Sequence, residues 1–164
     1  MTGVSSDTAD QRELRSSVRA LLEAHAPVRA QLTDDGSPWQ RLTADLGLTA
    51  LAVREEHGGA GATFAELAVV LEEAGRTLLR APLLPTAVAA VVLQDVAPEL
   101  VEPLLDGTST AAVALSGSLD TVPWAPGAGL VLVVTGDALL LAEDSQVVPR
   151  EPLDPTRPIG RVVV

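Results

Sequence analysis

The sequence predicts an α+β fold, in which an all-α helical domain precedes a small and incomplete antiparallel β domain. Up to about residue 107, apolar residues recur at three- and four-residue intervals, which is the spacing of helix faces. From about residue 108, short apolar runs alternate with Gly, Pro and Asp, which is typical of strands joined by turns. We therefore expect a helical domain over 1–107 and a partial β domain over 108–164.

Composition limits the kinds of partner and chemistry. The 164 residues are 47% hydrophobic but 2% aromatic, so the core must consist of Leu, Val and Ala. The net charge is −11 and every cation is arginine, which argues against nucleic acid as a partner. The lack of cysteine excludes disulfides and thiolate catalysis. With no signal peptide and no apolar run of about 18 residues, we expect a cytoplasmic protein without a membrane span.

Two helices are expected first. The first helix has one apolar face, formed by Leu14, Val18, Leu21 and Leu22, and Pro27 stops or bends this helix. His25 lies near the end of the helix and is interpreted as solvated or as interacting with the helix dipole. A second helix is expected to begin at Ser37-Pro38, with serine as N-cap and proline as first helical residue, and to end at Gly47.

The segment from Val53 to Pro85 carries the densest local signals. Residues 54–61 contain three glycines in four positions and must form a turn. Thr63 and Glu66 form a capping box for the next helix. That helix is expected to bury Phe64, Leu67, Ala68, Leu71, Ala74 and Leu78.

Charged residues of this segment are interpreted as structural. Glu72 and Glu73 are expected on a solvated face, with Glu72 and Arg76 paired at four-residue spacing. The adjacent Glu55, Glu56 and His57 cannot readily converge on one ion, so no metal site is predicted.

A nearly all-apolar helix is expected to start at Pro85 and to run through Thr86–Leu93. A helix that is apolar on every side is buried on every side, so this one lies in a bundle centre or forms the wall of an apolar pocket. Strands are expected at residues 111–116, 130–135, 138–142, 146–149 and 160–164, with a hairpin turn at Gly136-Asp137. The final Val-Val-Val predicts a truncation or an edge that needs a partner.

Taken together, these motifs resemble the acyl-CoA dehydrogenase family. The resemblance is best from Trp39 to Leu93. It is carried by Trp39, Leu42, Leu46-Gly47-Leu48, Leu51-Ala52-Val53, Glu55-Glu56-His57-Gly58-Gly59-Ala60-Gly61, the helix from Glu66 to Arg76, and Pro82-Leu83-Leu84-Pro85-Thr86-Ala87.

The resemblance implies an N-terminal helical domain, a middle β domain and a C-terminal helix bundle, with FAD between the last two. It implies α,β-dehydrogenation of an acyl-CoA thioester, an electron-transfer flavoprotein as acceptor, and a homo- or hetero-oligomer. The flavin contacts it implies here are Leu115 and Ser116, and the substrate pocket wall is Leu84, Thr86, Ala87 and Ala90. The glutamate base belongs to the bundle, so no catalytic residue is assigned in this chain.

The sequence departs from the family at several points. Arg54 stands where the family has proline, and the glycine-lysine motif of the middle domain is absent. Because these residues include neither the base glutamate nor the flavin interface that the resemblance implies, we expect the 164-residue chain alone not to turn over substrate. Two alternatives stay open: a non-flavin partner subunit of a hetero-oligomeric dehydrogenase, or a non-enzymatic acidic helical interaction module. Co-purification with a full-length family member would support the partner subunit. The interaction module is distinguished by whether the Thr86–Leu93 helix borders an open cleft or is packed on all sides.

Overall fold

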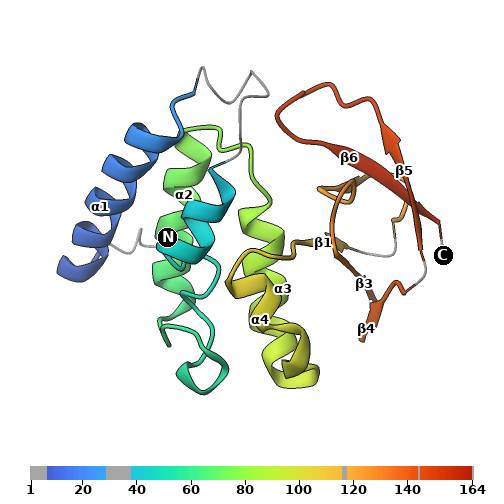
Figure 1. Cartoon of the computed structure of the whole chain (residues 1–164), viewed down its shortest axis with the longest axis horizontal. Coiled ribbons are helices and arrows are strands. Elements are labelled where there is room, and N and C mark those ends of the chain that lie inside the picture. The colour runs from blue at the N-terminus through green and yellow to red at the C-terminus, as the bar shows by residue number, and fades with distance from the viewer. Residues whose placement is uncertain (1–6, 29–37, 116–117, 144, 164) are drawn as a thin grey trace, which may run out of the picture.

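The computed structural model describes residues 7–28, 38–115, 118–143 and 145–163. Helical segments come first along the chain and strands follow, so the predicted α+β class is confirmed (Figure 1). The helices are α1 (Ala9–His25), η2 (Arg41–Asp45), η3 (Glu55–His57), α2 (Phe64–Arg76), α3 (Leu83–Val96), η4 (Pro98–Leu100) and α4 (Glu102–Leu105). The strands are β1 (Ala111–Ala114), β2 (Val122–Pro123), β3 (Leu130–Thr135), β4 (Ala138–Leu141), β5 (Gln146–Arg150) and β6 (Ile159–Val163).

The strands form two three-stranded sheets, in the orders β1-β3-β4 and β2-β6-β5. The hairpin between β3 and β4 is confirmed, and Gly136 takes the positive φ of 59° that its turn requires. One pairing differs from the antiparallel expectation, because β1 and β3 are parallel. The long loop between them carries the chain back so that both strands run in the same direction. This loop also contains β2, which is too short at two residues to show a sequence pattern.

The local signals around α2 are borne out, but its predicted buried face is not fully correct. Thr63 and Glu66 form the expected capping box, and Gly47 has the expected left-handed conformation after η2. Phe64 and Leu78, however, are 65% and 50% exposed, and Ala68 is exposed as well. Phe64 is the first residue of α2, and Leu78 lies beyond its end with φ of 51°, so neither shares the inward face. The predicted N-cap Ser37 lies outside the described residues.

The expectation of a solvated Glu72-Glu73 pair is wrong for Glu73, whose side chain is 1% exposed. It lies between α1 and α2 and binds Arg15 and Arg19 of α1. Glu72 also contacts Arg15, and Arg76 approaches Glu73 at 3.5 Å instead of the predicted Glu72. The pairing partners come from α1, more than 50 residues earlier, so helix spacing alone could not show them.

α3 lies between α2 and the strands, where it contributes to two parts of the core (Figure 1). Its start packs with α1 and α2, and its later turns pack with β1 and β3. The members of this second cluster are Val53, Ala89, Ala90, Val91, Leu93, Val101, Leu104, Ala111 and Leu132. The helical part and the β part therefore both pack against α3, through two separate core clusters.

Candidate functional site

One side of α3 is apolar and open within the described part of the chain. Leu84, Val92 and Val96 are 55%, 40% and 66% exposed, and Val88 is half-buried. These four residues recur every fourth position, so they follow one side of the helix. We call this stripe the open face of α3. The expectation that α3 is packed on every side is therefore wrong, because its apolar surface exceeds what the surrounding elements cover.

The four residues expected to form a pocket wall are divided between the two sides of α3. Leu84 belongs to the open face, but Thr86, Ala87 and Ala90 have no exposed surface and lie in the core. Two positions along a helix correspond to a rotation of about 200°, so Thr86 faces away from Leu84. The open positions that sequence reasoning missed are Val88 and Val92, and the four-residue spacing from Leu84 is the signal that could have found them.

Thr86 joins α3 to the first strand. Its hydroxyl oxygen accepts a hydrogen bond from the backbone N–H of Ala111, at 3.1 Å, in a buried position. Ala111 begins β1 and is itself fully buried. A residue expected to face ligand thus holds the helix against the sheet.

The predicted flavin contacts follow the end of β1. Leu115 is 66% exposed, and Ser116 lies outside the described residues. A site for a cofactor as large as FAD needs several converging polar groups. Leu115 offers its backbone and an apolar side chain, so Leu115 alone does not make an FAD site.

Arg54 connects the glycine-rich turn to the end of α3. Its backbone N–H donates to the side-chain oxygen of Gln94 at 2.9 Å, and its Nη1 donates to Asp95 at 2.7 Å. The guanidinium also contacts Glu56 at 2.8 Å and the Nε2 of His57 at 3.1 Å. These polar residues bind one another, and no group of three metal-ligating side chains that could hold an ion occurs in the described part of the chain.

The carboxylates with shifted pKa values are poorly suited to act as bases. The Thr63 hydroxyl lowers the pKa of Glu66 to about 2, with help from Gln11. Hydrogen bonds from Arg19 lower the pKa of Glu73 to about 2, against the opposing effect of desolvation. A general base works best when its pKa lies near the operating pH, so neither group is suited to that role at neutral pH.

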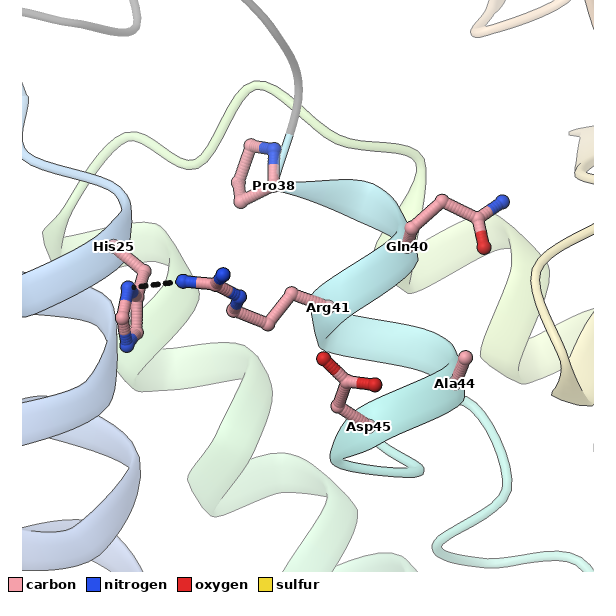
Figure 2. Close-up of a pocket in the computed structure, with 6 residues that line it drawn as sticks. All are labelled: His25, Pro38, Gln40, Arg41, Ala44 and Asp45. Carbon is pink, nitrogen blue, oxygen red and sulfur yellow. Dashed lines mark hydrogen bonds between the residues drawn. The ribbon is translucent and has the colours of Figure 1, made fainter.

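A separate recess lies between the end of α1 and η2 (Figure 2). Its volume is about 410 Å³. Figure 2 shows Arg41 pointing toward His25, with 2.8 Å between Nη1 of Arg41 and Nδ1 of His25. His25 is the last residue of α1, as expected. The lining residues are His25, Pro38, Gln40, Arg41, Ala44 and Asp45, none of which belongs to α3 or to a strand.

Comparison with known proteins identifies the family. The family model described as "Acyl-CoA dehydrogenase, N-terminal domain" matches residues 8–99, which is more than half of the chain. The chain belongs to the acyl-CoA dehydrogenase family. The family predicted from the sequence motifs is therefore confirmed. Among the described residues, no helix is long and apolar enough to cross a membrane.

The curated relatives are longer than the region that this chain matches. Acyl-CoA dehydrogenase IpdE2 of Mycolicibacterium smegmatis is 34% identical over 164 residues, which cover 94% of this chain and 52% of the relative. Acyl-CoA dehydrogenase FadE34 of Mycobacterium tuberculosis is 34% identical over 138 residues, which cover 74% of this chain and 19% of the relative. The chain thus spans about half the length of IpdE2.

Solved acyl-CoA dehydrogenases share the fold. The structure titled "Tcur3481-Tcur3483 steroid ACAD G363A variant" has a TM-score of 0.74 and 25% identity, over 94% of this chain and 54% of the other. A glutaryl-coenzyme A dehydrogenase bound to glutaryl-CoA has a TM-score of 0.73 and 14% identity, over 97% and 54%. Another glutaryl-CoA dehydrogenase, from Mycobacterium smegmatis, was solved with FADH2. At these lower identities the likeness supports the fold alone.

Proposed function

We propose that this chain is the N-terminal part of an FAD-dependent acyl-CoA dehydrogenase, with a helical domain over 1–107 and a partial middle β domain over 108–164. The observation that carries the proposal is the open face of α3, an apolar stripe that no other described residues cover, in a chain of this family. In the proposed enzyme this face forms one wall of the site for the acyl group of an acyl-CoA thioester.

Leu84, Val88 and Val92 would bind the acyl group by removing apolar surface from water, a gain of about 0.8 kcal/mol for each buried methylene. Thr86, Ala87 and Ala90 support this wall from behind, in the core. Asp95 is the one carboxylate on α3, and it binds Arg54. No base is assigned on α3, and we propose that the base that removes the α proton comes from a C-terminal helix bundle, as the resemblance to the family implies.

The proposed acyl group is bulky: it either contains fused hydrocarbon rings or is branched. The side chains on the open face are short and aliphatic, so they leave more room than aromatic side chains would. The structural relative at 25% identity is described as a steroid acyl-CoA dehydrogenase. FAD would accept the hydride from the acyl group, and an electron-transfer flavoprotein would reoxidise the reduced flavin.

A second arrangement is a subunit of a hetero-oligomer in which a partner chain completes the active site. The description of the structure at 25% identity names two components, Tcur3481 and Tcur3483, which favours the hetero-oligomer. The ChsE4-ChsE5 complex of Mycobacterium tuberculosis, at TM-score 0.75 and 22% identity, shows that this fold occurs in a complex of two named chains. Co-purification of a second dehydrogenase chain carrying all of the flavin would favour this arrangement over a homo-oligomer.

The test uses the complete natural protein. We expect flavin absorbance and dye reduction that depend on acyl-CoA, with higher kcat/KM for a ring-containing acyl-CoA than for butyryl-CoA. Val88→Phe reduces the space for the acyl group beside the proposed wall. It should lower kcat/KM for the ring-containing substrate by more than about tenfold, as expected for overfilling an apolar site. Val148→Phe on β5 is the control, since Val148 is 41% exposed and lies on another element. A protein with no acyl-CoA-dependent reduction would refute the proposal.

A further inference from the structure

The contact between Thr86 and Ala111 joins the two parts of the proposed site. Thr86 lies on α3, whose opposite side carries the open face. Ala111 begins β1, and β1 leads directly to Leu115, the described residue of the predicted flavin contact. The hydrogen bond, at 3.1 Å, therefore links the helix proposed to hold substrate with the strand that leads toward the proposed cofactor.

The geometry of β1 explains why this bond is needed. Within the described strands, β1 is at the edge of its sheet and pairs with β3. At the start of this pair, Leu130 donates its N–H to the carbonyl of Thr110, whereas Ala111 donates its own N–H to Thr86. Ala111 has no exposed surface, so water cannot replace the hydroxyl. Thr86 thus satisfies a buried backbone donor at the strand edge.

Small residues bring α3 close enough for this contact. Ala89 and Ala90 of α3 pack in one core cluster with Ala111 of β1 and Leu132 of β3. Apolar packing is non-directional and tolerates sliding of the helix along the sheet. A hydrogen bond requires a defined distance and angle, so it selects one position.

We propose that Thr86 is a positioning residue, which fixes the placement of α3 relative to β1 and thereby the distance of the acyl wall from the cofactor side. It touches neither substrate nor flavin, because it is buried on the far side of α3. The inference rests on the proposed function and deepens it. A misplacement of about 1 Å between reacting groups can cost about a hundredfold in rate, so a small shift of α3 is sufficient to matter.

The test compares Thr86→Val, which keeps the shape but removes the acceptor, with Thr86→Ser, which keeps the hydroxyl. Thr49→Val is the control, because Thr49 is 1% exposed and its hydroxyl donates to the carbonyl of Leu105 within the helical part. The complete natural protein is used, and kcat is expressed per bound flavin. The deuterium isotope effect on the acyl-CoA substrate is measured as well, since it does not depend on the amount of active enzyme.

We expect Thr86→Val to lower kcat per flavin by about tenfold and to raise the isotope effect, because the reacting groups are less well aligned. Hydrogen exchange at the Ala111 amide should also become faster. Thr86→Ser should restore all three readouts, and Thr49→Val should lower Tm without changing them. If Thr86→Val fails to fold, Thr86→Ala removes the same acceptor with a smaller side chain and gives the same comparison.

Two results would overturn the inference, and they are distinguishable. An inactive wild-type protein refutes the proposed function and this role with it. An active wild type, in which the variants at Thr86 lower Tm as Thr49→Val does but leave kcat per flavin and the isotope effect unchanged, refutes the positioning role alone.

Discussion

Arg19 binds the buried carboxylate of Glu73 through two hydrogen bonds of 2.8 Å, from Nε to Oε2 and from Nη2 to Oε1. Arg15 adds a third bond to Oε1 at 3.0 Å. This paired geometry matches the planar guanidinium to the planar carboxylate and gives the contact its direction. Because α1 supplies both arginines and α2 supplies Glu73, the contact fixes the packing of these two helices in the described chain.

Glu73→Gln should therefore destabilise the protein. The amide keeps the shape but cannot accept on both sides, and it leaves two arginines facing a neutral group. Breaking a buried ion pair costs about 3–5 kcal/mol, and we expect about 2 kcal/mol here because both arginines are partly exposed. Glu72→Gln is the control, since Glu72 is 60% exposed. Urea unfolding of both variants is the measurement, and equal losses would contradict the role of Glu73.

The same contact predicts a pH dependence. The pKa of Glu73 is lowered from 4.5 to about 2 in the folded protein, first by the Arg19 hydrogen bonds. A lowered folded-state pKa gives stability that is fully present above the unfolded pKa and is lost as pH falls toward the folded pKa. The difference in unfolding free energy between wild type and Glu73→Gln should be constant above about pH 5.5 and shrink toward pH 2. A difference that stays constant from pH 7 to pH 3 would contradict this assignment.

The substitutions Arg54→Pro and Arg54→Ala both remove the arginine side chain, but only Arg54→Pro also removes the backbone N–H. Arg54 has φ of −64°, which proline adopts readily, and the family has proline at this position. Proline has no N–H, however, so the buried oxygen of Gln94 loses its donor. An unsatisfied buried acceptor costs about 1–3 kcal/mol, which exceeds the gain of about 0.4–1 kcal/mol from a stiffer unfolded chain.

Arg54→Pro should thus be less stable than Arg54→Ala, which keeps the N–H. Adding Gln94→Leu to Arg54→Pro removes the orphaned acceptor and should recover most of the loss. Thermal unfolding of the three variants gives the answer. If Arg54→Pro equals or exceeds Arg54→Ala in Tm, the bond to Gln94 contributes no more than the gain that proline provides by stiffening the unfolded chain.

What could be read from the sequence was local in origin. The Thr63–Glu66 capping box and the turn at Gly136 depend on residues within four positions, and both are present. The buried state of Glu73 and the role of Thr86 depend on partners 54 and 25 positions away. The exposed side of α3 could not be predicted for a different reason. An all-apolar helix has no polar side that marks which residues face outward. The family motifs identified the fold without showing these contacts.

Two glycines give a matched pair of substitutions. A Cβ on Gly59 would lie 2.0 Å from the carbonyl oxygen of Val53, a backbone atom that cannot move without shifting the glycine-rich turn. A Cβ on Gly75, in α2, would meet nothing within 4 Å. Val53 is fully buried against α3, so displacement of the turn also disturbs the core between α3 and the strands.

We expect Gly59→Ala to destabilise the protein by about 3 kcal/mol, in the range of overpacking a tight core. Gly75→Ala should stabilise it by about 0.5–1 kcal/mol, because alanine loses less conformational freedom in a helix. Urea unfolding of both variants at pH 7 is the measurement. A Gly59→Ala protein as stable as wild type would mean that the turn can move away from Val53, and the close approach of these two backbone segments would then not be required for the fold.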